Sequence, residues 1–141
     1  MKVKLSNEKL RYIALFEKLT KVTPRDCVMS DNDQITFVVD QGDMGRAIGE
    51  NGKNVSKVRK KLDSRVDVVE YSSDPQKFLK NIFSPAEVEE IEIEEEEDQK
   101  VAIVHVKESD KGRAVGRNGW NIDRARKLSS RHHGLSDVSI P

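Results

Sequence analysis

Hydrophobic and polar positions along the first half of the chain predict a mixed series of helices and strands. Residues 6–19 show helical spacing after Ser6, a suitable helix cap, and the apolar positions are Leu10, Ile13, Leu15, Phe16 and Leu19. The runs 27–29 and 34–39 predict two strands, and Pro24 closes the helix before them. Val55, Val58 and Leu62 then predict a second amphipathic helix, and 66–70 alternates as a third strand.

The second half repeats this series. Asp74 and Pro75 suit a cap and first helical position, and Pro85 ends a helix whose apolar face is Phe78, Leu79, Ile82 and Phe83. A strand with one solvent-exposed face is predicted where Val88, Ile91 and Ile93 are interspersed with glutamates. Two more strands are predicted at 101–106 and 137–140. Ile122, Ala125 and Leu128 or Ser129 give the intervening helix its apolar face. We therefore expect an α+β fold of two small domains, 1–72 and 73–141.

An internal sequence repeat supports this duplication. Residues 43–60 read DMGRAIGENGKNVSKVRK, residues 110–127 read DKGRAVGRNGWNIDRARK, and they align without a gap. Identical positions in the first copy are Asp43, Gly45, Arg46, Ala47, Gly49, Asn51, Gly52, Asn54, Arg59 and Lys60. Such a fixed-period match indicates one structural unit used twice.

Each copy contains a Gly-x-x-Gly turn, 49–52 and 116–119. Glycine permits positive φ and close backbone approach, so a phosphate chain could meet main-chain N–H groups and the positive end of the next helix. A tight helix–helix turn is the alternative for one such motif, and the matched second copy argues against it. Asn54 after Gly52-Lys53 breaks the Walker pattern, and neither copy has Gly-x-Gly-x-x-Gly after a strand.

Charge adds local detail to these turns. The chain carries 25 Lys and Arg against 25 Asp and Glu, so no overall polycation draws it to nucleic acid. Basic residues nevertheless flank the turns: Arg46, Lys53, Lys57, Lys60, Arg113, Arg117, Arg124 and Lys127. They suit phosphates or, alternatively, a solvated helix face. Trp120 stands where Lys53 stands in the first copy, and it could stack a base or pack between the two units.

Other residues restrict the function classes. The single cysteine, Cys27, lies in an apolar run and suits a buried, inert thiol. His105, His132 and His133 have no cysteine or carboxylate at ligand spacing, so we expect no metal and no cofactor. We also expect no catalysis, no signal peptide, no membrane segment and a cytoplasmic location. The acidic block 87–98 should face solvent and repel RNA, or contact a basic protein.

The segments 47–55 and 114–122, AIGENGKNV and AVGRNGWNI, resemble the central motif of KH domains. With a helix and strand before each core, the copies resemble type II KH domains, each a three-stranded sheet packed against three helices. Their close tandem spacing resembles the paired KH module of NusA transcription factors. No polymerase-binding domain or oligonucleotide-binding barrel stands before the pair, so the layout is similar to the archaeal NusA-like proteins.

The resemblance implies that the glycine loops clamp about four nucleotides of RNA each. It also implies an apolar groove for bases, where Ile48, Val55, Val68, Val115 and Ile122 serve as groove or as core. The candidate RNA-binding residues are Arg46, Ile48, Gly49, Glu50, Asn51, Gly52, Lys53, Lys57, Arg113, Val115, Gly116, Arg117, Asn118, Gly119, Trp120 and Arg124.

Three functions remain open from the sequence. One is single-stranded RNA binding as a NusA-like factor in transcription termination or antitermination, with RNA polymerase or other transcription proteins as partners. Another is KH-type RNA binding in ribosome assembly or translation. The third is a protein-interaction scaffold without RNA binding. We expect a monomer in each case.

Overall fold

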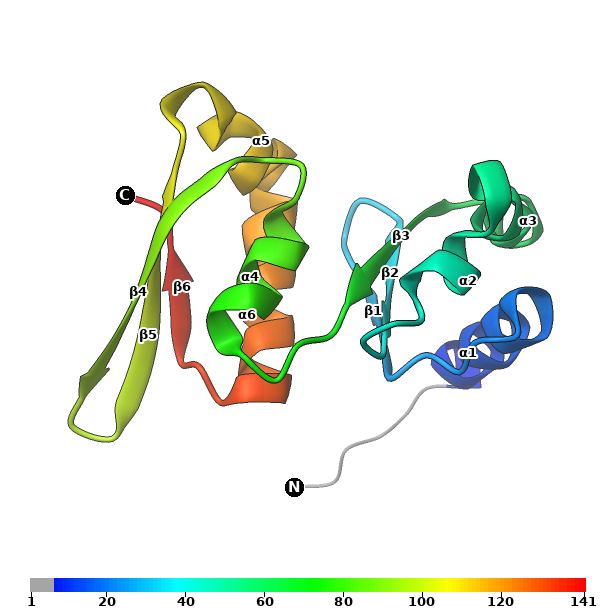
Figure 1. Cartoon of the computed structure of the whole chain (residues 1–141), viewed down its shortest axis with the longest axis horizontal. Helices are drawn as coiled ribbons and strands as arrows, with labels where there is room; N and C mark the ends of the chain where they lie inside the picture. Colours follow the sequence, from blue (N-terminus) through cyan, green and yellow to red (C-terminus); the bar gives the residue numbers. More distant parts are fainter. Residues whose placement is uncertain (1–6) are drawn as a thin grey trace. The chain divides into compact units, whose positions relative to one another are not determined.

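The computed structural model describes residues 7–141, which form one compact unit up to Tyr71 and another from Ser72 (Figure 1). Ser6, the expected cap of the first helix, lies outside the described residues. The assignment of 1–72 and 73–141 as two separate domains stays a prediction.

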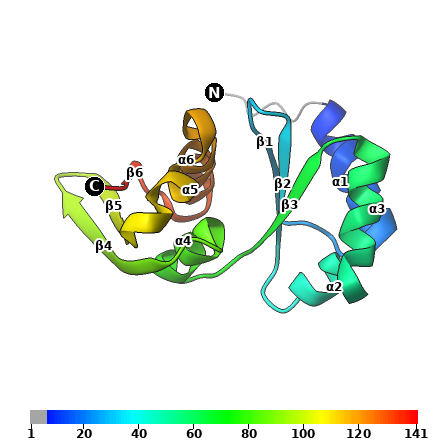
Figure 2. The ribbon, with the colours of Figure 1, turned by 90° about the horizontal axis from the view of Figure 1, so that it is seen from above.

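The first unit follows the predicted order of elements. These are α1 (Asn7–Thr20), β1 (Asp26–Met29), β2 (Gln34–Val39), α2 (Met44–Ile48), the short 3₁₀ turn η1 (Glu50–Gly52), α3 (Lys53–Leu62) and β3 (Arg65–Glu70). Its sheet has the order β1-β2-β3, with β1 antiparallel and β3 parallel to β2. The three helices lie on one face of this sheet (Figure 2).

The central strand explains why this sheet forms. All six residues of β2 are buried, which agrees with its nearly continuous β-branched and aromatic run. Phe37 stacks on Phe16 of α1 with ring centroids 4.2 Å apart. Val55 and Val58 of α3 join the same core as predicted, whereas Leu10 of α1 is 48% exposed and was wrongly assigned to the apolar face.

The second unit repeats the topology. Its elements are α4 (Pro75–Phe83), β4 (Val88–Glu96), β5 (Gln99–Val106), η2 (Glu108–Asp110), α5 (Lys111–Val115), η3 (Arg117–Gly119), α6 (Trp120–His133) and β6 (Asp137–Ser139). The sheet order is β4-β5-β6, again antiparallel and then parallel. The predicted cap is present, because the Asp74 carboxylate accepts a hydrogen bond of 3.0 Å from the Gln76 N–H.

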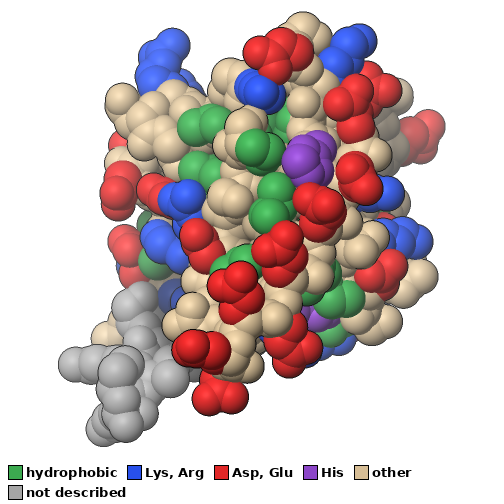
Figure 3. All heavy atoms as spheres, turned by 90° about the vertical axis from the view of Figure 1, so that its left-hand side faces the viewer, with side chains coloured by type: hydrophobic (Ala, Val, Ile, Leu, Met, Phe, Trp, Pro, Cys, Tyr) green, Lys and Arg blue, Asp and Glu red, His purple; other side chains and the backbone are tan. Residues whose placement is uncertain are grey.

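The face of the second sheet that points away from its helices is acidic. Along β4 the side chains of Ile91 and Ile93 are buried or half-buried, while the intervening glutamates are exposed, as the alternating pattern predicts. Figure 3 shows acidic side chains gathered over this face. Each unit is thus a three-stranded sheet with three helices, the predicted α+β fold. Among the described residues, no helix is long and apolar enough to cross a membrane.

Candidate nucleic-acid interface

The two Gly-x-x-Gly loops have nearly the same backbone. Gly49 has φ 78° and ψ 167°, Asn51 has φ 57° and ψ 27°, and Gly52 has φ 73° and ψ 17°. In the second unit the values are 81° and 160° for Gly116, 58° and 23° for Asn118, and 76° and 15° for Gly119. The largest difference, 167° against 160°, is small enough that one loop conformation is built twice.

The first glycine of each loop is required because its φ is positive and because a Cβ at this position would clash with the following helix. A Cβ on Gly49 would lie 2.8 Å from the backbone N of Asn54, and a Cβ on Gly116 would lie 2.9 Å from the backbone N of Asn121. Both distances are shorter than real Cβ contacts, so the loop can pack on its helix only when this residue is glycine.

A repeated asparagine fixes the chain before each loop through a hydrogen bond. The Asn54 side-chain amide donates to the Arg46 carbonyl at 2.8 Å, and Asn121 donates to the Ala114 carbonyl at the same distance. These two asparagines were visible in the repeat but were not among the candidate site residues. Their role is to position the loop, and the signal that could have found them is their identity in both copies.

The loops leave two consecutive amides available. The N–H groups of the glycines and of the residue after each loop are used within the turn, for example Gly52 N–H to the Gly49 carbonyl at 3.0 Å. Within residues 7–141, the N–H groups of Glu50, Asn51, Arg117 and Asn118 have no hydrogen-bond partner. These amides stand at the N-termini of α3 and α6, where the helix dipole favours an anion. The arrangement can hold a phosphate at each loop.

The side chains around the two loops differ in charge. Lys53, Lys57, Arg113 and Arg117 are exposed near their loops. Arg46 is exposed too, but its guanidinium pairs with the Asp43 carboxylate at 2.7 Å. The first variable position is Glu50 in one loop and Arg117 in the other, so the second loop has the more positive surroundings at this point.

Arg124 does not lie with these exposed bases. It is 3% exposed, and its guanidinium donates to the Ile82 carbonyl at 2.9 Å and to the Asn121 side-chain oxygen at 2.6 Å. The guanidinium also lies 4.8 Å from the centre of the half-buried Trp120 ring. Helical spacing alone predicted a phosphate contact for Arg124, whereas its position supports the loop and the indole from within the unit.

The apolar candidates separate into two groups. Val55, Val68 and Ile122 are 5%, 7% and 8% exposed and belong to the cores of their units. Ile48 and Val115, each directly before a loop, are half-buried. These two side chains are the ones that remain accessible to a base beside the loop.

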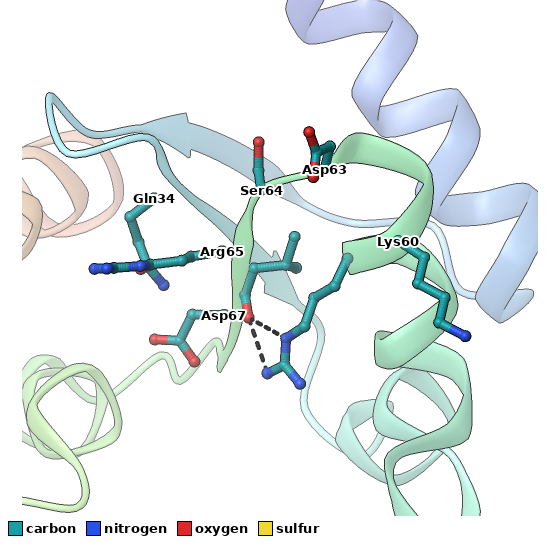
Figure 4. Close-up of a pocket in the computed structure, with 8 residues that line it drawn as sticks. Gln34, Lys60, Asp63, Ser64, Arg65 and Asp67 are labelled. Atoms are coloured by element: carbon teal, nitrogen blue, oxygen red, sulfur yellow. Dashed lines mark hydrogen bonds between the residues drawn. The ribbon is translucent and has the colours of Figure 1, made fainter.

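A depression of about 730 Å³ lies at the other end of α3 and is not part of the loop site (Figure 4). Its lining mixes acids with bases, including Asp63, Arg65 and Asp67. The Arg59 guanidinium donates to the Val66 carbonyl at 3.2 and 3.1 Å, and its repeat equivalent Arg126 donates to the Val138 carbonyl at 3.0 Å. The repeated arginine therefore joins helix to strand in both units.

One histidine has carboxylate neighbours that sequence spacing did not reveal. The His105 Nε2 and a Glu92 carboxylate oxygen are 3.0 Å apart, and with Glu90 the potential ligand atoms lie within 4.8 Å of one another. Pairing of β4 with β5 brings Glu90 opposite His105. The argument that no carboxylate stands near a histidine was therefore wrong, although an exposed group of this kind is common without an ion.

Comparisons with known proteins agree with this architecture. Residues 10–73 match the family model of the KH domain, and residues 75–138 match that of the NusA-like second KH domain. A Halococcus morrhuae protein named "Probable transcription termination protein NusA" is 39% identical over 140 residues, covering 99% of both chains. A Methanocaldococcus jannaschii protein of the same name is 34% identical, covering 99% of this chain and 75% of its own. The crystal structure of APE1850 superposes with a TM-score of 0.81 at 38% identity, covering 97% of this chain and all of the other.

Proposed function

Since the chain belongs to the NusA-like family of paired KH domains, we propose that it binds single-stranded RNA and acts as a transcription termination or antitermination factor. The observation that carries the proposal is the repeated loop, which presents in each unit two amides at a helix N-terminus that have no partner in the described part of the chain. KH domains use such a loop to clamp the RNA backbone.

Each loop would bind a phosphate through its amides, and nearby side chains would supply charge and apolar contact. Lys53 and Lys57 serve the first loop, and Arg113 and Arg117 serve the second. Ile48 and Val115 would contact bases, and Trp120 offers an aromatic surface beside the second loop. Arg124 and Asn121 position these groups rather than touch RNA.

The RNA clamp is tested with aspartates at the variable loop positions. The variants Glu50→Asp/Asn51→Asp and Arg117→Asp/Asn118→Asp make both variable positions acidic, and Asp tolerates the positive φ of the second position. Because Glu50 is already acidic, the first variant adds one negative charge, whereas the second changes the charge by three. We expect each to weaken binding to a random single-stranded RNA pool in fluorescence anisotropy. The matched control for the second loop is Gln76→Asp/Lys77→Asp, which makes the same charge change on exposed positions of α4.

The outcomes separate the candidate functions. Unchanged binding by both loop variants would contradict the clamp. If the wild-type chain binds no RNA at modest salt, the protein-interaction scaffold becomes the better hypothesis. The names of the relatives favour transcription over ribosome assembly, and a single-round transcription assay with an archaeal RNA polymerase tests this step. We expect added protein to change the fraction of terminated transcripts, and the loop variants to lose that effect.

A further inference from the structure

A second basic surface lies in the first unit, outside the loop. It is a shallow groove of about 380 Å³ between α1 and α3, which lie side by side (Figures 1 and 2). The residues that line it are Leu15, Lys18, Leu19, Lys57, Lys60 and Lys61, called the lysine groove below. The two leucines are half-buried and the four lysines are exposed, so an apolar strip is bordered by ammonium groups.

The positive charge of the lysine groove has no acidic partner among residues 7–141. No acidic residue lines it, and none of its four lysines forms an ion pair within residues 7–141. Other basic residues of the same unit do have partners, such as Lys9 with Asp26 at 3.2 Å and Arg25 with Asp40 at 2.8 Å. Four like charges without a counterion attract a polyanion.

Three of the groove lysines lie on the helix that follows the first loop. Helix α3 begins at Lys53, directly after the loop, and rises 1.5 Å per residue. Lys57 therefore lies about 6 Å from Lys53 along the helix axis, and Lys61 about 12 Å. Lys60 extends away from Arg65 and Asp67 of the neighbouring depression (Figure 4). A nucleic-acid strand leaving the loop along α3 would meet these ammonium groups next.

The second unit lacks the equivalents of two of these lysines. The repeat aligns Lys57 with Arg124 and Lys61 with Leu128, which are 3% and 0% exposed. Lys60 aligns with Lys127, which is also exposed. Lys57 and Lys61 therefore distinguish the first unit, even though both units keep the same loop.

We propose that the lysine groove is a second RNA subsite, which binds the phosphates of nucleotides that flank those held by the first loop. The proposal rests on RNA binding as proposed above. RNA is favoured over an acidic protein segment because Lys57 of the groove lies about one helical turn after Lys53, the residue that follows the loop that would hold RNA. The lining has no aromatic ring and no amide side chain, so contacts would be to the backbone, with little sequence preference.

The test uses Lys18→Gln/Lys61→Gln, two exposed positions in helices that tolerate glutamine well. Binding of a five-nucleotide and a fifteen-nucleotide RNA is measured by anisotropy over a series of salt concentrations. Each phosphate contact in a single strand contributes about 0.7 to the salt slope. The double variant should therefore lower the slope for the long RNA by about 1.4 and weaken binding by roughly 25-fold at 0.1 M salt. The short RNA, held by a loop alone, should bind as to wild type.

The control is Lys77→Gln/Lys80→Gln, which removes the same charge from exposed positions of α4. If the loop variants weaken binding but the groove variant behaves like this control, the lysine groove is not an RNA subsite and the proposed function stands. If the loop variants bind as wild type, the proposed function itself fails. A poly-glutamate chain that binds with the same dependence on Lys18 and Lys61, while long RNA does not, would overturn the assignment in favour of an acidic protein partner.

Discussion

Two glycines in the second unit should respond in opposite directions to the same substitution by alanine. Gly112 lies inside α5, and a Cβ there would meet no atom within 4 Å. Gly116 has φ 81° and ψ 160°, and its Cβ would lie 2.7 Å from Trp120 Cδ1 and 2.9 Å from the Asn121 backbone N. The side chain of Trp120 can turn, but the backbone of α6 cannot move without disturbing the helix.

The expected magnitudes follow from this geometry. Gly112→Ala should stabilise the unit by about 0.5 kcal/mol, because alanine restricts the unfolded chain and is compatible with a helix. Gly116→Ala forces a residue with a Cβ into a region of φ and ψ that only glycine occupies readily, which costs about 1–3 kcal/mol. Displacing tightly packed neighbours costs about 1–3 kcal/mol more. The two variants should therefore differ by roughly 2.5 to 6.5 kcal/mol in the free energy of unfolding.

The chain provides its own probe for this measurement. Its single tryptophan, Trp120, lies in the second unit, so fluorescence during urea unfolding reports that unit. Gly45 and Gly49 form the matching pair in the first unit, where far-ultraviolet circular dichroism gives the readout. Equal stability of Gly116→Ala and wild type, or a larger loss from Gly112→Ala than from Gly116→Ala, would show that the close approach is not what requires glycine.

Three further predictions concern side chains. Asn121→Ala should destabilise its unit by about 2–4 kcal/mol, because it removes a buried donor and a hydrogen bond to a buried guanidinium. Asn54 is more exposed, so Asn54→Ala should cost only about 1 kcal/mol. Urea titrations measure both losses of unfolding free energy, and equal losses would contradict this reasoning. Asp74→Ala should cost about 1 kcal/mol in the same fluorescence assay through loss of the helix cap, with Asp74→Ser as a capping control that recovers most of it. Burial, reinforced by the Glu8 carboxylate, raises the pKa of the Tyr12 phenol above 10.0, so its contribution to stability is complete below that pH and is lost as pH rises through the folded value. An absorbance titration of a Tyr71→Phe variant should give a midpoint above 10.0, and a midpoint at or below it would refute the assignment.

Sequence reasoning predicted the loops and the central strands well because these depend on local chemistry. The Gly and Asn residues of the loops adopt the positive φ expected of them, and β2 spans the predicted residues 34–39. The ends of exposed strands were less predictable. Strand β5 begins at Gln99, two residues before the apolar run, because hairpin pairing with β4 extends it past the apolar residues.

The misplaced side chains depend on partners far away in the chain. Arg124 is buried because it reaches the Ile82 carbonyl, 42 residues earlier, and periodicity along one helix contains no information about that carbonyl. The proximity of His105 to Glu92 depends on the register of β4 and β5, which includes an irregularity between Val88 and Glu90. Such contacts follow from tertiary packing and could not be obtained from spacing alone.

The shared loop backbone separates two kinds of evolutionary constraint. The glycines and the asparagine that donates a hydrogen bond to a carbonyl of the helix before each loop determine whether the loop can form. Substitutions at these positions should be selected against because they destabilise the fold. Glu50 and Arg117 are exposed and occupy the same place in their loops, and their side chains make no hydrogen bond within residues 7–141. Mutation at this position can therefore alter the loop's charge without affecting folding. Duplication followed by drift at one exposed residue is enough to give two loops of one shape different affinities for the same anionic chain.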